Sequence, residues 1–245
     1  AEREGIDEQP ADGRILGSFA NGGSHESWAA GARPMGLGVW GDKLYHGVVN
    51  SGAYGGPNEA AVFVSERDGS AMRLVLRLDL DYRKNQWAWK PWSDQNSGGG
   101  HDALLSDIAV RRNGDLLLGL RDRSGDNGST FGAGDLIIAR QQGGQWVPDT
   151  SSGGEFYKDD ITHVEPLWGG LALSPLGDRV VSTVVDPLEV FTAGAIWFDN
   201  ETGMPGLKET LYDQRAHASQ ELTFGKAQGL GDVESLCPPP FIPTF

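Results

Sequence analysis

The chain has 245 residues, of which 36 are Gly and 13 are Pro, and 38% of its residues are hydrophobic. This content of Gly and Pro disfavours long helices, and the hydrophobic fraction is sufficient to fill a core, which excludes a disordered chain. The formal net charge of −14 excludes a surface that wraps nucleic acid, because phosphate binding needs clustered Lys and Arg.

Residues 1–32 are predicted to supply one strand and a linker. The strand covers residues 13–19, and it has the pattern of an outer strand that closes a preceding sheet. The chain begins Ala-Glu-Arg, without Met or a signal peptide, which indicates a processed or excised chain. Its single cysteine, Cys237, allows no disulfide within the chain, and the sequence has no apolar run of 18 residues to span a membrane.

A pattern of two apolar strands around a Gly-Asp turn then occurs three times. The turns lie at residues 41–42, 114–115 and 177–178, so they are 73 and 63 residues apart. Each is predicted to be a tight hairpin, in which Gly adopts a positive φ and Asp bonds the local backbone. The repetition indicates one structural unit used three times.

A third and a fourth strand follow in each unit. The third is short and apolar and runs into a turn at Gly69, Gly143 or Gly203. The fourth is more polar, and its three copies cover residues 72–80, 145–148 and 207–212. This gradient predicts buried inner strands and an exposed edge strand in each unit.

The predicted fold is therefore all-β, a β-propeller of about three four-stranded blades at residues 33–100, 101–162 and 163–225. Residues 226–245 are expected to hold the inner strand of an unfinished blade, Gln228–Leu236, and a Pro-rich tail. Propellers close with roughly four to eight blades, so we expect a missing N-terminal half or a second copy to complete the ring. A sandwich or a three-stranded β-prism is the alternative fold.

Several short phrases resemble a propeller region of large secreted bacterial surface proteins that carry serine-aspartate-repeat-type B domains. The phrases lie at residues 33–39, 87–92, 105–108, 118–123, 153–157, 170–172, 185–187 and 223–237. The resemblance implies a secreted or cell-surface location and an adhesive or scaffolding role, with more propeller before residue 1 and β-sandwich modules after Cys237. It implies no catalytic residue. The short loop at residues 50–58 and the tail after Cys237 depart from the pattern.

One candidate metal site lies in the loop of residues 121–130. Asp122, Asp126 and Asn127 offer oxygen ligands beside flexible Gly, which suits Ca²⁺, although the spacing lacks the acidic twelfth residue of an EF-hand. Arg121 and Arg123 flank these acids, so ion pairs that join neighbouring blades are the alternative interpretation.

One candidate carbohydrate site lies in the loop between the first two blades. Trp87, Trp89 and Trp92 alternate there, ahead of a Gly-rich stretch. Tryptophans in this arrangement stack on sugar rings or fill gaps between blades. The alternation places Trp87 and Trp89 on one strand face, which favours packing for these two and leaves Trp92 as the better sugar contact.

Further acidic residues are candidates for acid–base chemistry, with hydrogen bonds between blades as the alternative. They are Asp107, Asp186, Asp232 and Glu234 near the ends of inner strands, and Glu155, Asp159 and Asp160 with His163 in a loop. The histidine spacing predicts no zinc site, and the sequence lacks a nucleophile elbow, a P-loop and a dinucleotide fingerprint.

These features predict a non-enzymatic extracellular protein whose propeller binds a protein or a glycan. A polysaccharide hydrolase or lyase that uses the channel carboxylates is the first alternative, and an adhesin stabilised by Ca²⁺ is the second. No metal or cofactor is required by the first interpretation.

Overall fold

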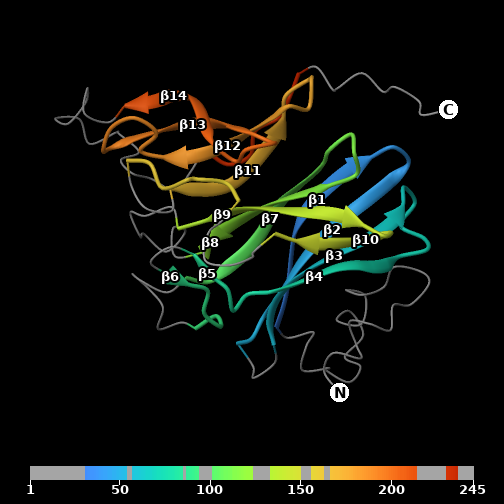
Figure 1. Ribbon diagram of the computed structural model, residues 1–245. Coiled ribbons are helices and arrows are strands. Elements are labelled where there is room, and N and C mark those ends of the chain that lie inside the picture. The colour runs from blue at the N-terminus through green and yellow to red at the C-terminus, as the bar shows by residue number, and fades with distance from the viewer. Residues whose placement is uncertain are drawn as a thin grey trace.

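A computed structural model describes residues 31–53, 57–84, 87–93, 101–123, 133–149, 156–162, 166–213 and 230–236. Within these residues the backbone forms three four-stranded antiparallel sheets and one two-stranded sheet (Figure 1). No helix in these ranges is long and apolar enough to cross a membrane. The predicted strand at residues 13–19 lies outside the described residues.

Each large sheet is a meander whose strands follow one another in the chain. The first blade contains β1 (Ala32–Trp40), β2 (Lys43–Ser51), β3 (Asn58–Glu66) and β4 (Arg73–Asp79). The second contains β7 (Ala103–Val110), β8 (Leu116–Asp122), β9 (Asp135–Gln142) and β10 (Gln145–Pro148). The third contains β11 (Leu167–Leu173), β12 (Arg179–Val185), β13 (Thr192–Asp199) and β14 (Pro205–Asp213). The small sheet pairs β5 (Arg83–Lys84) with β6 (Trp87–Ala88), in the connection between the first two blades.

The six predicted turn glycines all adopt a positive φ, between 59° and 90°, which confirms the hairpins. They are Gly41, Gly69, Gly114, Gly143, Gly177 and Gly203. The aspartates of the Gly-Asp turns act differently from the prediction. Asp115 accepts a hydrogen bond from the backbone N–H of Gln141 in β9, and Asp178 accepts one from the hydroxyl of Ser174. They therefore connect strands or turn side chains, since the positive φ of the glycine already closes the turn.

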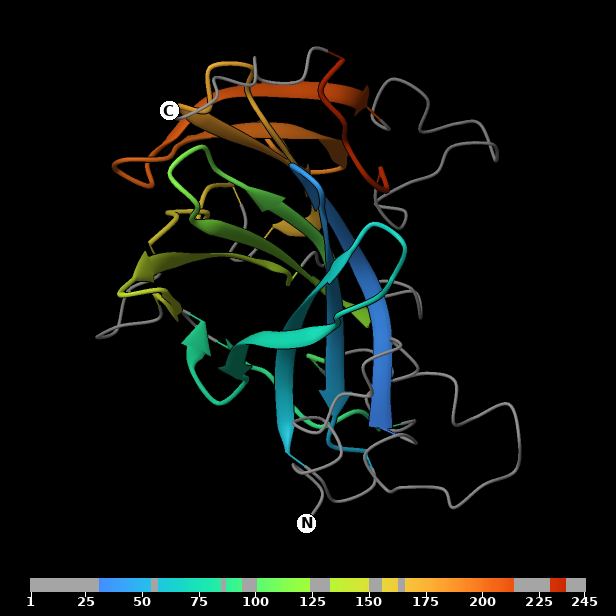
Figure 2. The same cartoon turned by 90° about the vertical axis from the view of Figure 1, so that its right-hand side faces the viewer.

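The three sheets fan out with the second blade between the other two (Figure 2). One apolar cluster fills the space between blades 1 and 2, with Val62 and Leu78 facing Leu118 and Ile137. A second cluster fills the space between blades 2 and 3 and includes Phe198. Adjacent sheets that share a core across their faces are the packing of propeller blades, and this arrangement confirms the β-propeller over a two-sheet sandwich.

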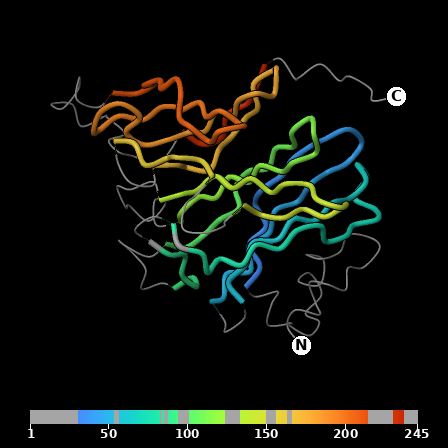
Figure 3. Tube along the Cα trace, in the orientation of Figure 1, coloured from blue at the N-terminus to red at the C-terminus, as the bar shows by residue number. Residues whose placement is uncertain are grey.

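The inner strands β1, β7 and β11 lie side by side, as the chain trace shows (Figure 3). Their close approach depends on glycine. A Cβ at Gly38 of β1 would collide with the carbonyl oxygen of Ile108 in β7, and a Cβ at Gly36 would lie 2.9 Å from the carbonyl oxygen of Leu105. Gly at every second position of β1 thus brings its backbone directly against blade 2.

Burial decreases from the inner to the outer strands, as the sequence predicts. Strand β8 is almost wholly buried, whereas most residues of the fourth strand β14 are exposed. Outer strands with polar and charged side chains are protected against pairing with other chains.

Residues 230–236 pack on the third blade at the position expected for the next inner strand, although they do not form a regular strand. The hydroxyl of Thr183 donates to the carbonyl of Gly231 at 3.1 Å, and Val233 packs on the apolar cluster of Val181 and Ala195. A Cβ at Gly170 would lie 2.5 Å from the carbonyl oxygen of Gly231, so glycine is again what allows the approach. The described part of the predicted segment Gln228–Leu236 therefore continues the series of inner strands.

Candidate functional site

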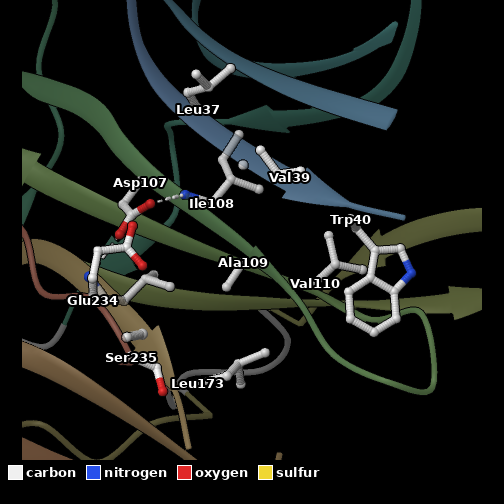
Figure 4. A pocket seen from close by; sticks show the side chains of 13 residues that line it. Leu37, Val39, Trp40, Asp107, Ile108, Ala109, Val110, Leu173, Glu234 and Ser235 are labelled. Carbon is white, nitrogen blue, oxygen red and sulfur yellow. Dashed lines mark hydrogen bonds between the residues drawn. The ribbon is translucent and has the colours of Figure 1, made fainter. Parts of the chain in front are cut away.

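A groove opens where the inner segments of the fold converge. Strands β1, β7 and β11 and residues 234–235 line a cavity of about 360 Å³, which is within the size range of ligand sites. Its walls are mostly aliphatic, with Trp40 at one end and Asp107 and Glu234 at the other (Figure 4). We call this cavity the central groove, because its walls are the strands that face the axis of a propeller.

The wall formed by β1 is unusually exposed for large apolar side chains. Met35, Leu37 and Val39 are 50%, 56% and 58% exposed, whereas their counterparts on the facing strands, Ile108 and Leu171, are buried. The alternation along β1 explains this: Gly36 and Gly38 face blade 2, so the large residues between them must point away from it. An exposed apolar stripe beside a cavity is a typical feature of a binding surface.

Asp107 and Asp232 occupy equivalent places in successive repeats. The Oδ1 atom of Asp107 accepts from the N–H of Ile108 at 2.7 Å, and Oδ1 of Asp232 accepts from the N–H of Val233 at the same distance. The other oxygen of Asp107 accepts from the N–H of Leu171 at 2.9 Å, which joins blade 2 to blade 3. Hydrogen bonds between blades, the alternative interpretation of Asp107 from the sequence, are therefore present.

Burial raises the pKa of Asp107 to about 8, and a hydrogen bond with the Asp232 side chain raises it further in the same direction. The N–H groups of Leu171 and Ile108 oppose this shift, because they stabilise the carboxylate. The pair consequently holds one proton between two carboxyl groups near neutral pH, and Asp107 acts as a hydrogen-bond donor to Asp232.

The acidic end of the groove has no cation opposite it among the described residues. The lining contains no Lys, Arg or His, and neither Asp107, Asp232 nor Glu234 takes part in an ion pair there. Other buried acids do have a basic partner: Glu59 pairs with Arg77 at 2.5 Å and Asp102 pairs with Arg123 at 2.6 Å. The groove end is thus the place where the described part of the fold leaves buried acidity without a basic side chain.

Trp92 and Arg123 are brought together, as members of one interaction network. The Trp92 ring lies between two guanidinium groups, 4.5 Å from Arg123 and 4.8 Å from Arg33, and its indole N–H donates to the carbonyl of Ala103. Arg123 donates two hydrogen bonds to Asp102, at 2.6 and 3.0 Å. This stack joins β1 to the second blade, so it stabilises the interface between blades.

The other two candidate tryptophans lie elsewhere. Trp89 is only 4% exposed, its indole N–H donates to the Tyr82 hydroxyl at 3.0 Å, and the ammonium of Lys84 lies 3.5 Å from its ring centre. It packs in the core between blades 1 and 2 and offers no open ring face to a sugar. The backbone of Trp87 belongs to β6, and its side chain lies outside the described residues.

The acids and bases of the predicted calcium loop are separated by the structure. Asp122 is fully buried, with one oxygen 2.8 Å from Nδ1 of His101 and the other accepting from the N–H of Asp102. Arg121 stacks 5.0 Å from the ring of Trp168 in blade 3. Asp126 and Asn127 lie outside the described residues. Among those that are described, no three His, Cys, Asp or Glu side chains are arranged to hold a metal ion.

The remaining candidate acids do not reach the groove. Asp186 follows β12 and closes a turn, where its side chain accepts from the N–H of Thr192 at 2.9 Å. Asp159 is buried and Asp160 is exposed in the connection between blades 2 and 3, while Glu155 and His163 lie outside the described residues. Of the sequence-predicted residues, the groove therefore unites Asp107, Asp232 and Glu234.

The apolar wall of the groove was not predicted as part of a site. Its signal is present in the sequence, because Gly alternates with Met35, Leu37 and Val39 over β1. Such a strand must turn one glycine face and one apolar face in opposite directions.

No known family model matches the chain. It is 24% identical over 235 residues to colossin-C of Dictyostelium discoideum, covering 81% of this chain and 24% of that protein. It is 28% identical over 182 residues to colossin-A of the same organism, covering 62% of this chain and 2% of that protein. The chain thus spans less than a quarter or so of the curated relatives that it matches.

Distant solved structures also match. They include the Dos1 propeller (TM-score 0.42, 12% identity, 73% of this chain and 37% of that chain). A GH43 β-1,3-galactosidase matches with a TM-score of 0.34 and 14% identity, over 75% of this chain and 58% of that chain. Likenesses this distant carry no inference about activity. The predicted resemblance to bacterial surface proteins is not tested by these relatives and stays a prediction.

Proposed function

We propose that the chain is a non-enzymatic propeller module of an extracellular or cell-surface protein, and that the central groove binds a protein or glycan partner. The observation that carries the proposal is the exposed stripe of Met35, Leu37 and Val39 beside a cavity of about 360 Å³. Exposing three large apolar side chains on an inner strand is unfavourable unless a ligand or partner covers them.

The state of the other candidate residues supports binding over catalysis. Trp92, Arg123, Asp122 and Trp89 each take part in packing or polar contacts that hold blades together. Residues with such contacts stabilise a scaffold, and the groove is left as the surface that meets a partner. We propose in addition that further blades, from the same precursor or from a second copy, complete the ring beside β1 and residues 230–236.

A polysaccharide hydrolase is the second candidate, and one observation favours it. Asp107 has a raised pKa and lies beside Glu234 in the groove, and glycoside hydrolases use one protonated and one ionised carboxyl group. The exposed apolar wall opposite these acids fits a sugar less well than it fits an apolar side chain, which is why binding is placed first.

A combined binding and turnover screen tests both candidates. The purified chain is titrated by calorimetry against panels of short peptides and oligosaccharides, and the same oligosaccharides are analysed for cleavage. We expect binding by at least one panel, lost on Leu37→Ser, with no cleavage product. Cleavage that disappears in Asp107→Asn would overturn the proposal in favour of the hydrolase, and silence in both panels would reject the groove as a site.

A further inference from the structure

The central groove has two chemically different ends, and together they restrict what it can bind. The aliphatic wall of Leu37, Val39 and Ile108 suits a hydrocarbon chain. The opposite end presents Asp107 and Glu234, with Asp232 bonded to Asp107. A ligand that fills the groove therefore has to be apolar along its length and to donate hydrogen bonds at one tip.

The charge of this end identifies the tip. Three carboxyl groups meet there with no Lys, Arg or His in the lining, and two of them share a proton in place of a cation. An ammonium group supplies three donors and a positive charge, so it satisfies the oxygens that the proton satisfies only in part. A lysine side chain combines such a tip with a four-carbon apolar stem.

We propose that the central groove is a docking site for a lysine side chain of a protein partner, presented on a segment with apolar neighbours. This inference rests on the proposed binding function and names its partner class. The stem lies along Leu37 and Val39, and the ammonium lies between Asp107, Asp232 and Glu234. The exposed stripe extends along β1 to Met35, beyond the reach of one side chain, which favours a peptide over a free amine.

Proton release follows from this geometry. Asp107 and Asp232 share a proton in the empty groove, and the ammonium displaces it when it binds. The charged groups that face Asp107 are Asp232 and Glu234, and the backbone N–H groups of Ile108 and Leu171 face it as neutral donors. Since the proton and the ammonium compete for the same oxygens, the affinity for a lysine peptide is expected to rise from about pH 6 to about pH 8.

The test uses three probes on the intact chain: a blocked peptide Leu-Lys-Leu, the same peptide with norleucine in place of Lys, and n-butylamine. Calorimetry is expected to show the lysine peptide binding at least about tenfold more tightly than the norleucine peptide, with proton release that depends on the buffer. Butylamine is expected to bind more weakly than the lysine peptide, because it leaves the stripe at Met35 uncovered. Butylamine that binds as tightly as the peptide would reject a protein partner.

Matched variants locate the site. Glu234→Gln and Leu37→Ser are expected to weaken the lysine peptide at least about fivefold. Glu209→Gln and Leu207→Ser are the controls, because Glu209 is also exposed and Leu207, in β14, is 54% exposed against 56% for Leu37. Equal effects in both pairs, or equal affinity for the lysine and norleucine peptides, would overturn the inference. Binding of only neutral peptides or oligosaccharides would refute this lysine site and leave the proposed binding function standing.

Discussion

The side chain of Asp107, in the inner strand of the second blade, is hydrogen-bonded to the side chain of Asp232, which lies on the segment after the third blade. Two carboxyl groups in contact hold a proton between them, because both cannot be charged at so short a separation. This contact joins the second blade to the segment that follows the third, across the groove that we propose as the binding site.

The first prediction concerns pH. The pKa of Asp107 is about 8 in the folded chain and 3.8 as the ordinary value, so the folded chain keeps a proton that the unfolded chain has lost between these values. The stabilisation is fully present below about pH 4, and the free energy of unfolding falls as the pH rises towards about 8. Urea unfolding from about pH 4 to about pH 9 measures this slope.

The substitution Asp232→Asn tests the assignment of that slope. The amide keeps the shape of the side chain and supplies a permanent donor to Asp107, so Asp107 ionises at lower pH. We expect a flatter profile than in the parent chain, with Glu209→Gln as a control that leaves the profile unchanged. A slope that is identical in Asp232→Asn would assign the pH dependence to other groups.

The second prediction concerns the contact of blades 1 and 2. In Gly38→Ala the new Cβ meets the carbonyl oxygen of Ile108, and the strands have to separate. We expect a loss of about 2 kcal/mol in the free energy of unfolding. The control is Gly206→Ala in β14, where the nearest atom to the new Cβ is the carbonyl oxygen of Trp197 at 3.4 Å. Equal unfolding midpoints for the two variants would show that β1 and β7 are not held this closely.

The third prediction compares a buried with an exposed ion pair. Asp102 is 1% exposed, so Arg123→Ala leaves its carboxylate buried and without the two hydrogen bonds from Arg123. We expect a loss of about 3 kcal/mol or more in chemical unfolding. Lys43→Ala removes the exposed pair with Glu66 and is expected to cost less than about 1 kcal/mol. The reverse order would contradict the role of Arg123 in joining the blades.

The fourth prediction concerns calcium. Both oxygens of Asp122 already contact His101 and the N–H of Asp102. We therefore expect a chelator to leave the thermal midpoint unchanged, measured by circular dichroism with and without added Ca²⁺. A midpoint that rises with Ca²⁺ would demonstrate a site linked to folding and would restore the calcium-stabilised adhesin as the preferred function.

Local chemistry was predictable where the repeat places Gly in a turn or grades the polarity of strands. The glycines at 41, 114 and 177 adopt the positive φ that the hairpins require, and β14 is the exposed edge that its polar residues indicate. These features depend on residues that are close in the chain, so pattern and turn chemistry suffice to find them.

The sequence by itself thus determined the blades, their order and the acidic residues of the groove. Only the tertiary structure decided that Asp107 meets Asp232, that Trp89 is buried while Trp92 stacks on Arg123, and that Leu37 and Val39 remain exposed. The physical reason is that each of these outcomes depends on how closely two blades approach. That distance is set by glycines such as Gly38 and Gly170, whose contacts lie on other strands and leave no periodic signal in the chain.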